Sequence, residues 1–123
     1  MEEEIFVKIA VIFKALGDTV RLKIIRCLCD EEKNVTQLIQ ELGMKQSNIS
    51  QHLKVLFQSG VVKRRKQGTQ TFYLIADPKV IQICRQLSRS MIKELSENAE
   101  KMMQIGETKE LFSHRNPQRT SKP

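Results

Sequence analysis

The stretch from Gly43 to Ala76 reads GMKQSNISQHLKVLFQSGVVKRRKQGTQTFYLIA, and it decides the fold that we predict. No Asp or Glu lies between Glu41 and Asp77, although the whole chain has 14 of these residues. The basic residues in this interval are Lys45, Lys54, Lys63, Arg64, Arg65 and Lys66. Because like charges repel one another, such a surface is typical of a site that binds a polyanion.

The same stretch combines two patterns that predict different structures. Apolar residues recur at spacings of four and three between Gln46 and Gln58, which predicts a helix. Two strand-like runs follow at residues 61–66 and 70–75, and the intervening Gln67-Gly68-Thr69 favours a turn. We interpret the helix as one that reads DNA and the hairpin as a basic β-wing.

Two helices are predicted at the start of the chain. The first covers residues 4–16, and its apolar face is wider than one packing partner requires. Asp18 is a good N-cap for the second helix, which we expect from Thr19 to about Cys29.

A third, short helix is predicted just before the DNA-reading helix. Val35 is a candidate start for a short strand, and Thr36 is a candidate cap for a helix that continues through Leu42. Gly43 is expected to end that helix. Two short helices joined by a turn with Gly are typical of a helix-turn-helix, whose second helix enters the major groove.

Asp77 and Pro78 are predicted to begin a last helix, as its N-cap and its first residue. Its apolar residues recur at helical spacing to about Met103, so its length is roughly 40 Å. A domain this small cannot cover so long an apolar stripe, and the wide face of the first helix also needs cover. A symmetric dimer that joins both helices covers both faces.

The predicted fold class is therefore mostly α with a small β-hairpin wing. It is a winged helix-turn-helix that dimerises through its first and last helices. Residues 1–103 are expected to form the DNA-binding and dimerisation domain, and residues 104–123 a flexible polar tail.

Composition narrows the class of protein further. The net charge of +7 favours nucleic acid or an anionic membrane as a partner, but no apolar run is long enough to cross a bilayer. The acidic N-terminus does not look like a signal peptide, which predicts a cytoplasmic protein. Three Cys do not indicate a disulfide framework in such a compartment. No nucleophile–base pair, phosphate loop or ligand cluster is visible, so an enzyme is not predicted.

Four motifs follow one another in a fixed order along residues 10–95. They are Leu16-Gly17-Asp18 with Arg21-Leu22, Val35-Thr36-Gln37-Leu38, Gln46-Ser47-x-x-Ser50-x-His52-Leu53-x-x-Leu56, and Gly60-Val61-Val62-x-x-Arg65-x-x-Gly68 before Phe72-Tyr73. At these spacings the chain resembles the ArsR/SmtB-type winged-helix repressors, which are small dimeric bacterial and archaeal sensors. The resemblance implies the fold, dimerisation and binding to an operator. The family pattern usually has Ser where Lys45 stands, so the DNA-reading helix lacks a capping hydroxyl and gains a charge.

The predicted DNA contacts lie on the DNA-reading helix and the wing. Gln and Asn pair bidentately with adenine, while Ser reaches base edges or the backbone. Lys and Arg neutralise phosphates or enter a minor groove. The predicted residues are Lys45, Gln46, Ser47, Asn48, Ser50, Gln51, His52, Lys54, Arg64, Arg65, Lys66 and Thr69.

Some of these residues have a second interpretation. Lys54 is equally typical of a solvated helix position. His52 is also typical of a buried residue whose hydrogen bonds position the helix. The run from Lys63 to Lys66 is also typical of an exposed edge strand that is protected against pairing with another chain.

The resemblance also implies an effector, because family members usually release DNA when they bind a metal or when their thiols are modified. The family's Cys-x-Cys motif is absent from the segment NVTQLIQEL, and His114 lies in the tail rather than on the last helix. We therefore predict no metal site of the usual kinds and no resident cofactor. The sensor candidates are Cys27, Cys29 and Cys84, through thiol modification or through binding of a soft metal or arsenite. Inert packing in the core is the other interpretation of all three.

We predict a homodimeric, sequence-specific DNA-binding regulator that represses transcription from a palindromic operator. A small inorganic or thiol-reactive effector is predicted to release it from this DNA. The alternative is a constitutive winged-helix DNA-binding protein that has no effector site.

Overall fold

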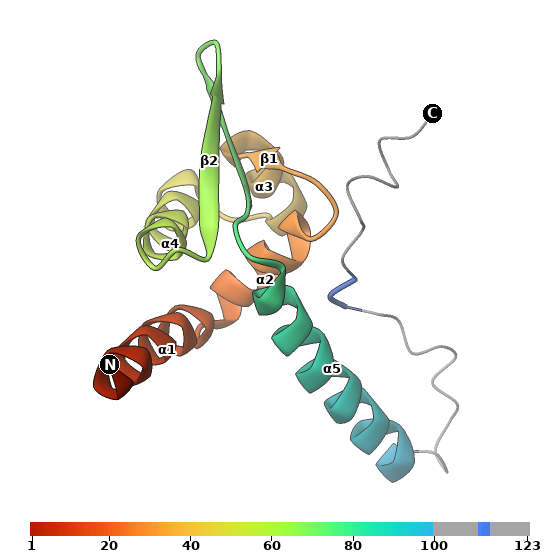
Figure 1. Cartoon of the computed structure of the whole chain (residues 1–123). Helices are drawn as coiled ribbons and strands as arrows, with labels where there is room; N and C mark the ends of the chain where they lie inside the picture. The colour runs from red at the N-terminus through yellow and green to blue at the C-terminus, as the bar shows by residue number, and fades with distance from the viewer. Residues whose placement is uncertain (100–110, 114–123) are drawn as a thin grey trace, which may run out of the picture.

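The computed structural model describes residues 1–99 and 111–113. Its elements are α1 (Glu2–Leu16), α2 (Thr19–Leu28), β1 (Lys33–Asn34), α3 (Val35–Leu42), α4 (Gln46–Gln58), β2 (Val62–Gln67), β3 (Gln70–Ile75) and α5 (Pro78–Ala99). In Figure 1 the β2–β3 hairpin projects from one side of the body, and α1 and α5 extend from the other. The fold is mostly helical with a small wing, which confirms the predicted fold class.

The sheet has one more strand than the predicted hairpin. Its order is β1-β3-β2, all antiparallel, with β1 pairing Lys33 with Tyr73 and Asn34 with Phe72. The predicted strand start at Val35 is wrong because the strand comes first and Val35 already begins α3. The short β1 ties the base of the wing to the segment between α2 and α3.

The cap of α3 also differs from the prediction, because Asn34 rather than Thr36 occupies that position. The Asn34 side chain accepts a hydrogen bond from the Gln37 N–H at 2.8 Å, and the Gln37 side chain accepts one from the Asn34 N–H at 2.8 Å. This reciprocal pair is a capping box, which satisfies two backbone donors at the start of the helix. Gly43 ends α3 with φ +66°, as predicted, in the left-handed region that Gly adopts without strain.

The core lies where α2, α3 and α4 meet the base of the wing and the start of α5. All three inward positions of α4 are buried, and so is Leu38 of α3. Burying one such Leu or Ile side chain stabilises the fold by roughly 1.5–3 kcal/mol. The packing of these side chains between α3 and α4 therefore holds the helix-turn-helix together. The buried apolar residues are Ala15, Leu16, Ile24, Ile25, Cys27, Leu28, Cys29, Leu38, Ile49, Leu53, Leu56, Val61, Val62, Val80, Ile81 and Cys84.

Large apolar side chains remain exposed on α1 and α5. Phe6 and Phe13 are 58% and 55% exposed, and Leu95 is 64% exposed. Ile5, Val7, Ile9, Val11, Leu87 and Met91 are also exposed on these two helices. Faces of this kind mark surfaces that pack against another molecule.

The end of the predicted last helix and most of the predicted tail lie outside the described residues. Residues 111–113 are the exception. Phe112 packs against the core, and its carbonyl accepts a hydrogen bond from Arg85 Nε at 2.7 Å.

Candidate DNA-binding surface

Helix α4 presents a polar face to solvent because Ile49, Leu53 and Leu56 occupy its inward positions. Gln46, Ser47, Asn48, Ser50, Gln51 and Lys54 are all exposed. The N-cap residue Lys45 makes no side-chain cap bond, so the first N–H groups of α4 are left without that partner. A helix N-terminus with free donors attracts anions, and Lys45 adds a positive charge there.

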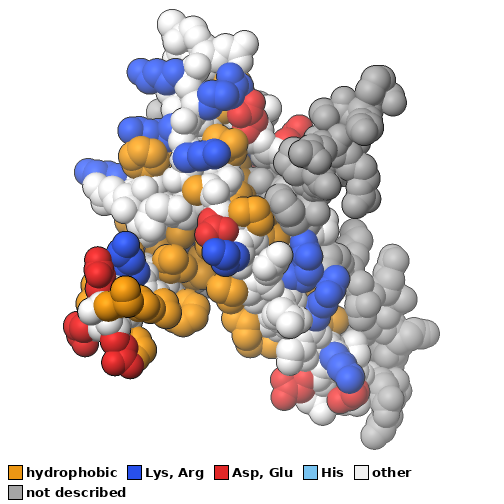
Figure 2. Space-filling view, viewed as in Figure 1, with side chains coloured by type: hydrophobic (Ala, Val, Ile, Leu, Met, Phe, Trp, Pro, Cys, Tyr) orange, Lys and Arg blue, Asp and Glu red, His pale blue; other side chains and the backbone are white. Residues whose placement is uncertain are grey.

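The wing places its cations on an exposed two-stranded ribbon. Val62 is buried at the base of β2, and residues 63–67 are exposed. The turn is tighter than predicted, since Gln67 pairs with Gln70 and only Gly68 and Thr69 form the loop. Figure 2 shows Lys and Arg side chains along the wing, whereas acidic side chains stand out at the N-terminal end of α1 and the far end of α5.

Arg64 lies on the side of the wing that faces α4. Its guanidinium carbon is 3.8 Å from the centroid of the Phe57 ring, in the last turns of α4. A hollow between the helix and the wing is lined by Ser50, Leu53, Lys54, Phe57, Gln58, Arg64 and Tyr73. The polar face of α4 and the wing therefore form one continuous surface.

Arg65 points to the other side of the ribbon and has an acidic partner. Its Nε donates to Glu32 Oε1 at 2.9 Å, and its Nη2 forms an ion pair with the second carboxylate oxygen. The hydrogen bonds from Arg65 lower the pKa of Glu32, and those same bonds raise the pKa of Arg65. The sequence pattern did not point to Glu32, which lies 33 residues earlier, outside the acid-free stretch.

His52 is the predicted DNA contact that lies away from the exposed face. Its side chain is 18% exposed, and its Nδ1 is 3.2 Å from Arg21 Nη1 and 3.7 Å from Asp18 Oδ2. This geometry favours the second interpretation, in which the hydrogen bonds of His52 position the helix.

Asp18 stabilises the start of α2, next to His52. As predicted, it is the N-cap: its Oδ2 accepts from the N–H groups of Val20 at 2.9 Å and Arg21 at 3.1 Å. The Arg21 N–H contributes most to holding the pKa of this carboxyl below its usual value. The carboxylate is therefore charged at neutral pH.

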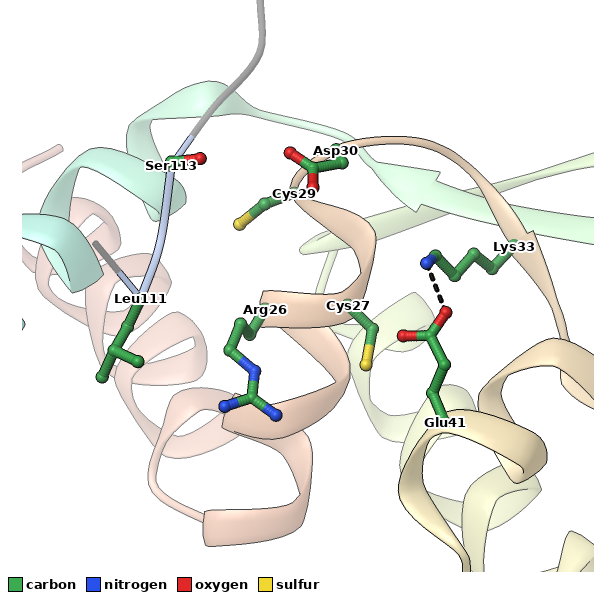
Figure 3. Close-up of a pocket in the computed structure, with 8 residues that line it drawn as sticks. All are labelled: Arg26, Cys27, Cys29, Asp30, Lys33, Glu41, Leu111 and Ser113. Atoms are coloured by element: carbon green, nitrogen blue, oxygen red, sulfur yellow. Dashed lines mark hydrogen bonds and ion pairs between the residues drawn. The ribbon is translucent and has the colours of Figure 1, made fainter. Parts of the chain in front are cut away.

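The three sensor candidates are free, buried thiols. Burial raises the pKa of Cys27 to about 11 and that of Cys29 to about 12, and it also raises the pKa of Cys84. Figure 3 shows that Cys27 points toward Glu41, which is paired with Lys33, while Cys29 points away from it. Besides burial, the charges of Asp30 and Cys84 contribute to raising the pKa of Cys29. Thiols with a raised pKa are poor nucleophiles at neutral pH.

Within residues 1–99 and 111–113, no group of three or more His, Cys, Asp or Glu side chains is arranged to hold a metal ion. Over the same residues, no helix combines the length and the apolar character needed to cross a membrane.

The fold and this surface define a winged helix-turn-helix protein of the DNA-binding class. The family description "Bacterial regulatory protein, arsR family" matches residues 18–64. An uncharacterized HTH-type transcriptional regulator of Methanocaldococcus jannaschii is 43% identical over 83 residues, which cover 67% of this chain and 93% of the relative. The chain therefore belongs to the arsR family, whose members are DNA-binding transcriptional regulators and not enzymes.

Two other relatives add detail. The transcriptional repressor PagR of Bacillus anthracis is 40% identical over 80 residues, which cover 64% of this chain and 80% of the relative. The solution structure of a homodimeric winged helix-turn-helix DNA-binding domain from Mycobacterium bovis, a possible ArsR-family regulator, matches with a TM-score of 0.72 at 26% identity. That match covers 78% of this chain and 89% of the neighbour.

Proposed function

We propose that this protein is a homodimeric, sequence-specific repressor of transcription that binds a palindromic operator. The observation that carries the proposal is the continuous surface of α4 and the wing, built by a segment that has no carboxylate from residue 42 to residue 76. The exposed Gln, Asn and Ser side chains of α4 read base edges, and the cations of the wing contact the flanking backbone.

The dimer forms through α1 and α5. Both helices extend from the side of the body away from the wing (Figure 1), and both expose large apolar side chains. A two-fold axis through this interface covers both faces and presents two copies of α4 to one duplex. The two copies then enter successive major grooves about one helical turn apart.

The remaining parts of the proposal concern organisation and location. Residues 1–103 are the DNA-binding and dimerisation domain, residues 104–123 are a polar tail, and the protein works in the cytoplasm, where its DNA is. The exposed face of α5, which continues to Leu95, supports the long dimerisation helix.

DNA binding is measured by fluorescence anisotropy with a selected palindrome and with random DNA. We expect a preference for the palindrome of at least ~10³. A monomer that binds neither DNA in dilute buffer would end the proposal.

We further propose that a small inorganic or thiol-reactive effector releases the protein from its operator. Cys29 and Cys84 support this proposal, because the charge of Cys84 is one of the causes that raise the pKa of Cys29 and because Cys84 lies on the dimerisation helix. An effector that modifies or bridges them shifts the dimer toward a spacing that fits DNA poorly. The second candidate function, a constitutive DNA-binding protein, is favoured by the raised pKa of all three thiols.

One assay separates the two candidates. Wild type and Cys84→Ser are bound to the palindrome and challenged with metal ions, arsenite, polysulfide and peroxide. A sensor loses DNA with at least one agent, and Cys84→Ser loses that response. If no agent releases the wild type, the constitutive protein is the correct description.

A further inference from the structure

The Arg21 side chain joins three parts of the fold around the recognition helix α4. Its Nε donates to the Ala15 carbonyl at 2.7 Å, and its Nη2 donates to the Lys14 carbonyl at 3.3 Å. Both carbonyls belong to the last turn of α1, and the Lys14 carbonyl also accepts from the Gly17 N–H at 3.2 Å. The remaining terminal nitrogen, Nη1, lies 3.2 Å from Nδ1 of His52 on α4.

The chemistry of the two side chains fixes the direction of the contact with His52. A guanidinium is always charged and has only donors, so His52 Nδ1 must accept, and its proton lies on Nε2. Asp18 Oδ2 lies 3.7 Å from the same nitrogen, beyond hydrogen-bonding distance, and it is already bonded to two N–H groups at the start of α2.

His52 is placed where it can set the position of the DNA-reading residues. It lies on α4 between the exposed residues Gln51 and Lys54, while its own side chain is turned inward and is mostly buried. Three apolar side chains of α4, Ile49, Leu53 and Leu56, pack into the core, and the contact with Arg21 adds a polar restraint to this packing. A directed hydrogen bond from a guanidinium that is itself fixed by two carbonyls restricts rotation and sliding of the helix.

We infer that Arg21 is a positioning residue for DNA recognition: through His52 it fixes the recognition helix against the end of α1, the helix assigned to the dimer interface. This inference rests on the proposed function. Neither side chain touches DNA in this role. The spacing of the two recognition helices in the dimer then depends on this contact, because Arg21 connects the dimerisation helix α1 to α4.

The experiment is a double-mutant cycle in DNA affinity. Arg21→Gln and His52→Leu each remove the contact, and we expect each to weaken binding to the palindrome about tenfold. The double variant should bind about as weakly as either single variant, because the contact can be lost only once. His52→Asn should recover most of the affinity, since its side-chain oxygen can accept from Arg21 at nearly the position of Nδ1.

Two controls separate positioning from other roles. Lys23→Gln removes one charge from an exposed position of the same helix, and its affinity should change less than twofold. The salt dependence of binding should be the same for Arg21→Gln and wild type, because a lost phosphate contact would reduce the slope by about one. Melting temperature and dimer mass are measured for every variant. If Arg21→Gln does not fold, the comparison of His52→Leu with His52→Asn tests the inference.

The outcomes are distinct. A wild type that binds no DNA overturns the proposed function. The role of Arg21 alone is overturned if the wild type binds its palindrome but one of two results follows. Either the affinity losses of the two single variants add in the double variant, or His52→Asn recovers no affinity.

Discussion

The guanidinium of Arg64 lies 3.8 Å from the centroid of the Phe57 ring, which joins the wing to the recognition helix. A cation over an aromatic face is held by the ring's electron density, and at an exposed site this contact is worth about 0.5–1 kcal/mol. The contact keeps Arg64 over α4 rather than free in solvent. We therefore expect the wing and α4 to approach DNA as one unit.

Phe57→Leu should weaken binding to all DNA sequences severalfold, because the wing is no longer held beside α4 while the apolar volume is largely kept. Phe57→Tyr keeps the ring and should bind like wild type. Affinities of both variants for the palindrome and for random DNA test this prediction. A loss confined to one base position would contradict it, since that result would make Phe57 a base contact.

Wing cations should act on every DNA sequence alike. Arg65→Ala combined with Lys66→Ala removes two charges that can neutralise phosphates, so affinity should fall on all sequences and the salt dependence should flatten. The measurement is binding at several salt concentrations with specific and random DNA. An unchanged slope would remove these residues from the interface.

Glu32 should weaken DNA binding, because its ion pair with Arg65 competes with a DNA phosphate for the guanidinium. Glu32→Gln frees the guanidinium for a phosphate, so we expect severalfold tighter binding and a salt slope that is steeper by about one. Glu31→Gln is the matched control, with the same change of net charge at the exposed neighbouring position. Equal gains in both variants would show a general effect of charge and would contradict a specific role for the pair.

The sequence predicted the helix-turn-helix and the wing well, because their signals are local. Apolar spacing within α4, the Gly43 stop and the Gly68 turn each act over a few residues, and the structure has all three. The cap of α3 was assigned to the wrong residue because Asn34 and Thr36 are both good caps within three positions. Only the reciprocal bond with Gln37 decides between them.

The contacts that orient the surface could not be predicted in the same way. Arg21 and His52 are 31 residues apart, and Arg65 and Glu32 are 33 residues apart. No periodicity links such positions, so a charge or a ring nitrogen in the sequence does not show its partner. The predicted roles of His52 and Arg65 as DNA contacts rested on residue type and on position in the DNA-reading helix and the wing, and both side chains have partners within the protein.

Sequence preference should depend on the first turn of α4. Gln46 is exposed at the first position of the helix, and its amide can pair with one adenine. Gln46→Ala should relax the preference at one base position by ~1–3 kcal/mol and leave binding to random DNA nearly unchanged. Affinities for a set of singly substituted palindromes test this. An equal loss on every sequence would make Gln46 a backbone contact instead.

Asp18 should make the stability depend on pH in the acid range. Its pKa is lowered in the folded protein from the usual 3.8, so its contribution to the free energy of unfolding is present above that value. The contribution is lost as the pH falls through the lower, folded-state pKa. Asp18→Asn keeps a capping oxygen but cannot titrate, so its melting temperature should fall less than that of wild type between pH 5 and about pH 2. Parallel melting curves for the two proteins would contradict this assignment.

The three thiols should react slowly in the folded protein. With the pKa of Cys27 raised to about 11 and that of Cys29 to about 12, almost no thiolate is present at neutral pH, and burial further restricts access. The rate of modification by an aromatic disulfide reagent should be far below that of a free cysteine, and it should reach the free rate when the protein is unfolded in urea. Cys27→Ser, Cys29→Ser and Cys84→Ser assign any faster phase to its residue. A single thiol that reacts at the free rate in the folded protein would contradict this prediction. If that thiol were Cys29 or Cys84, the result would favour the sensor over the constitutive DNA-binding protein.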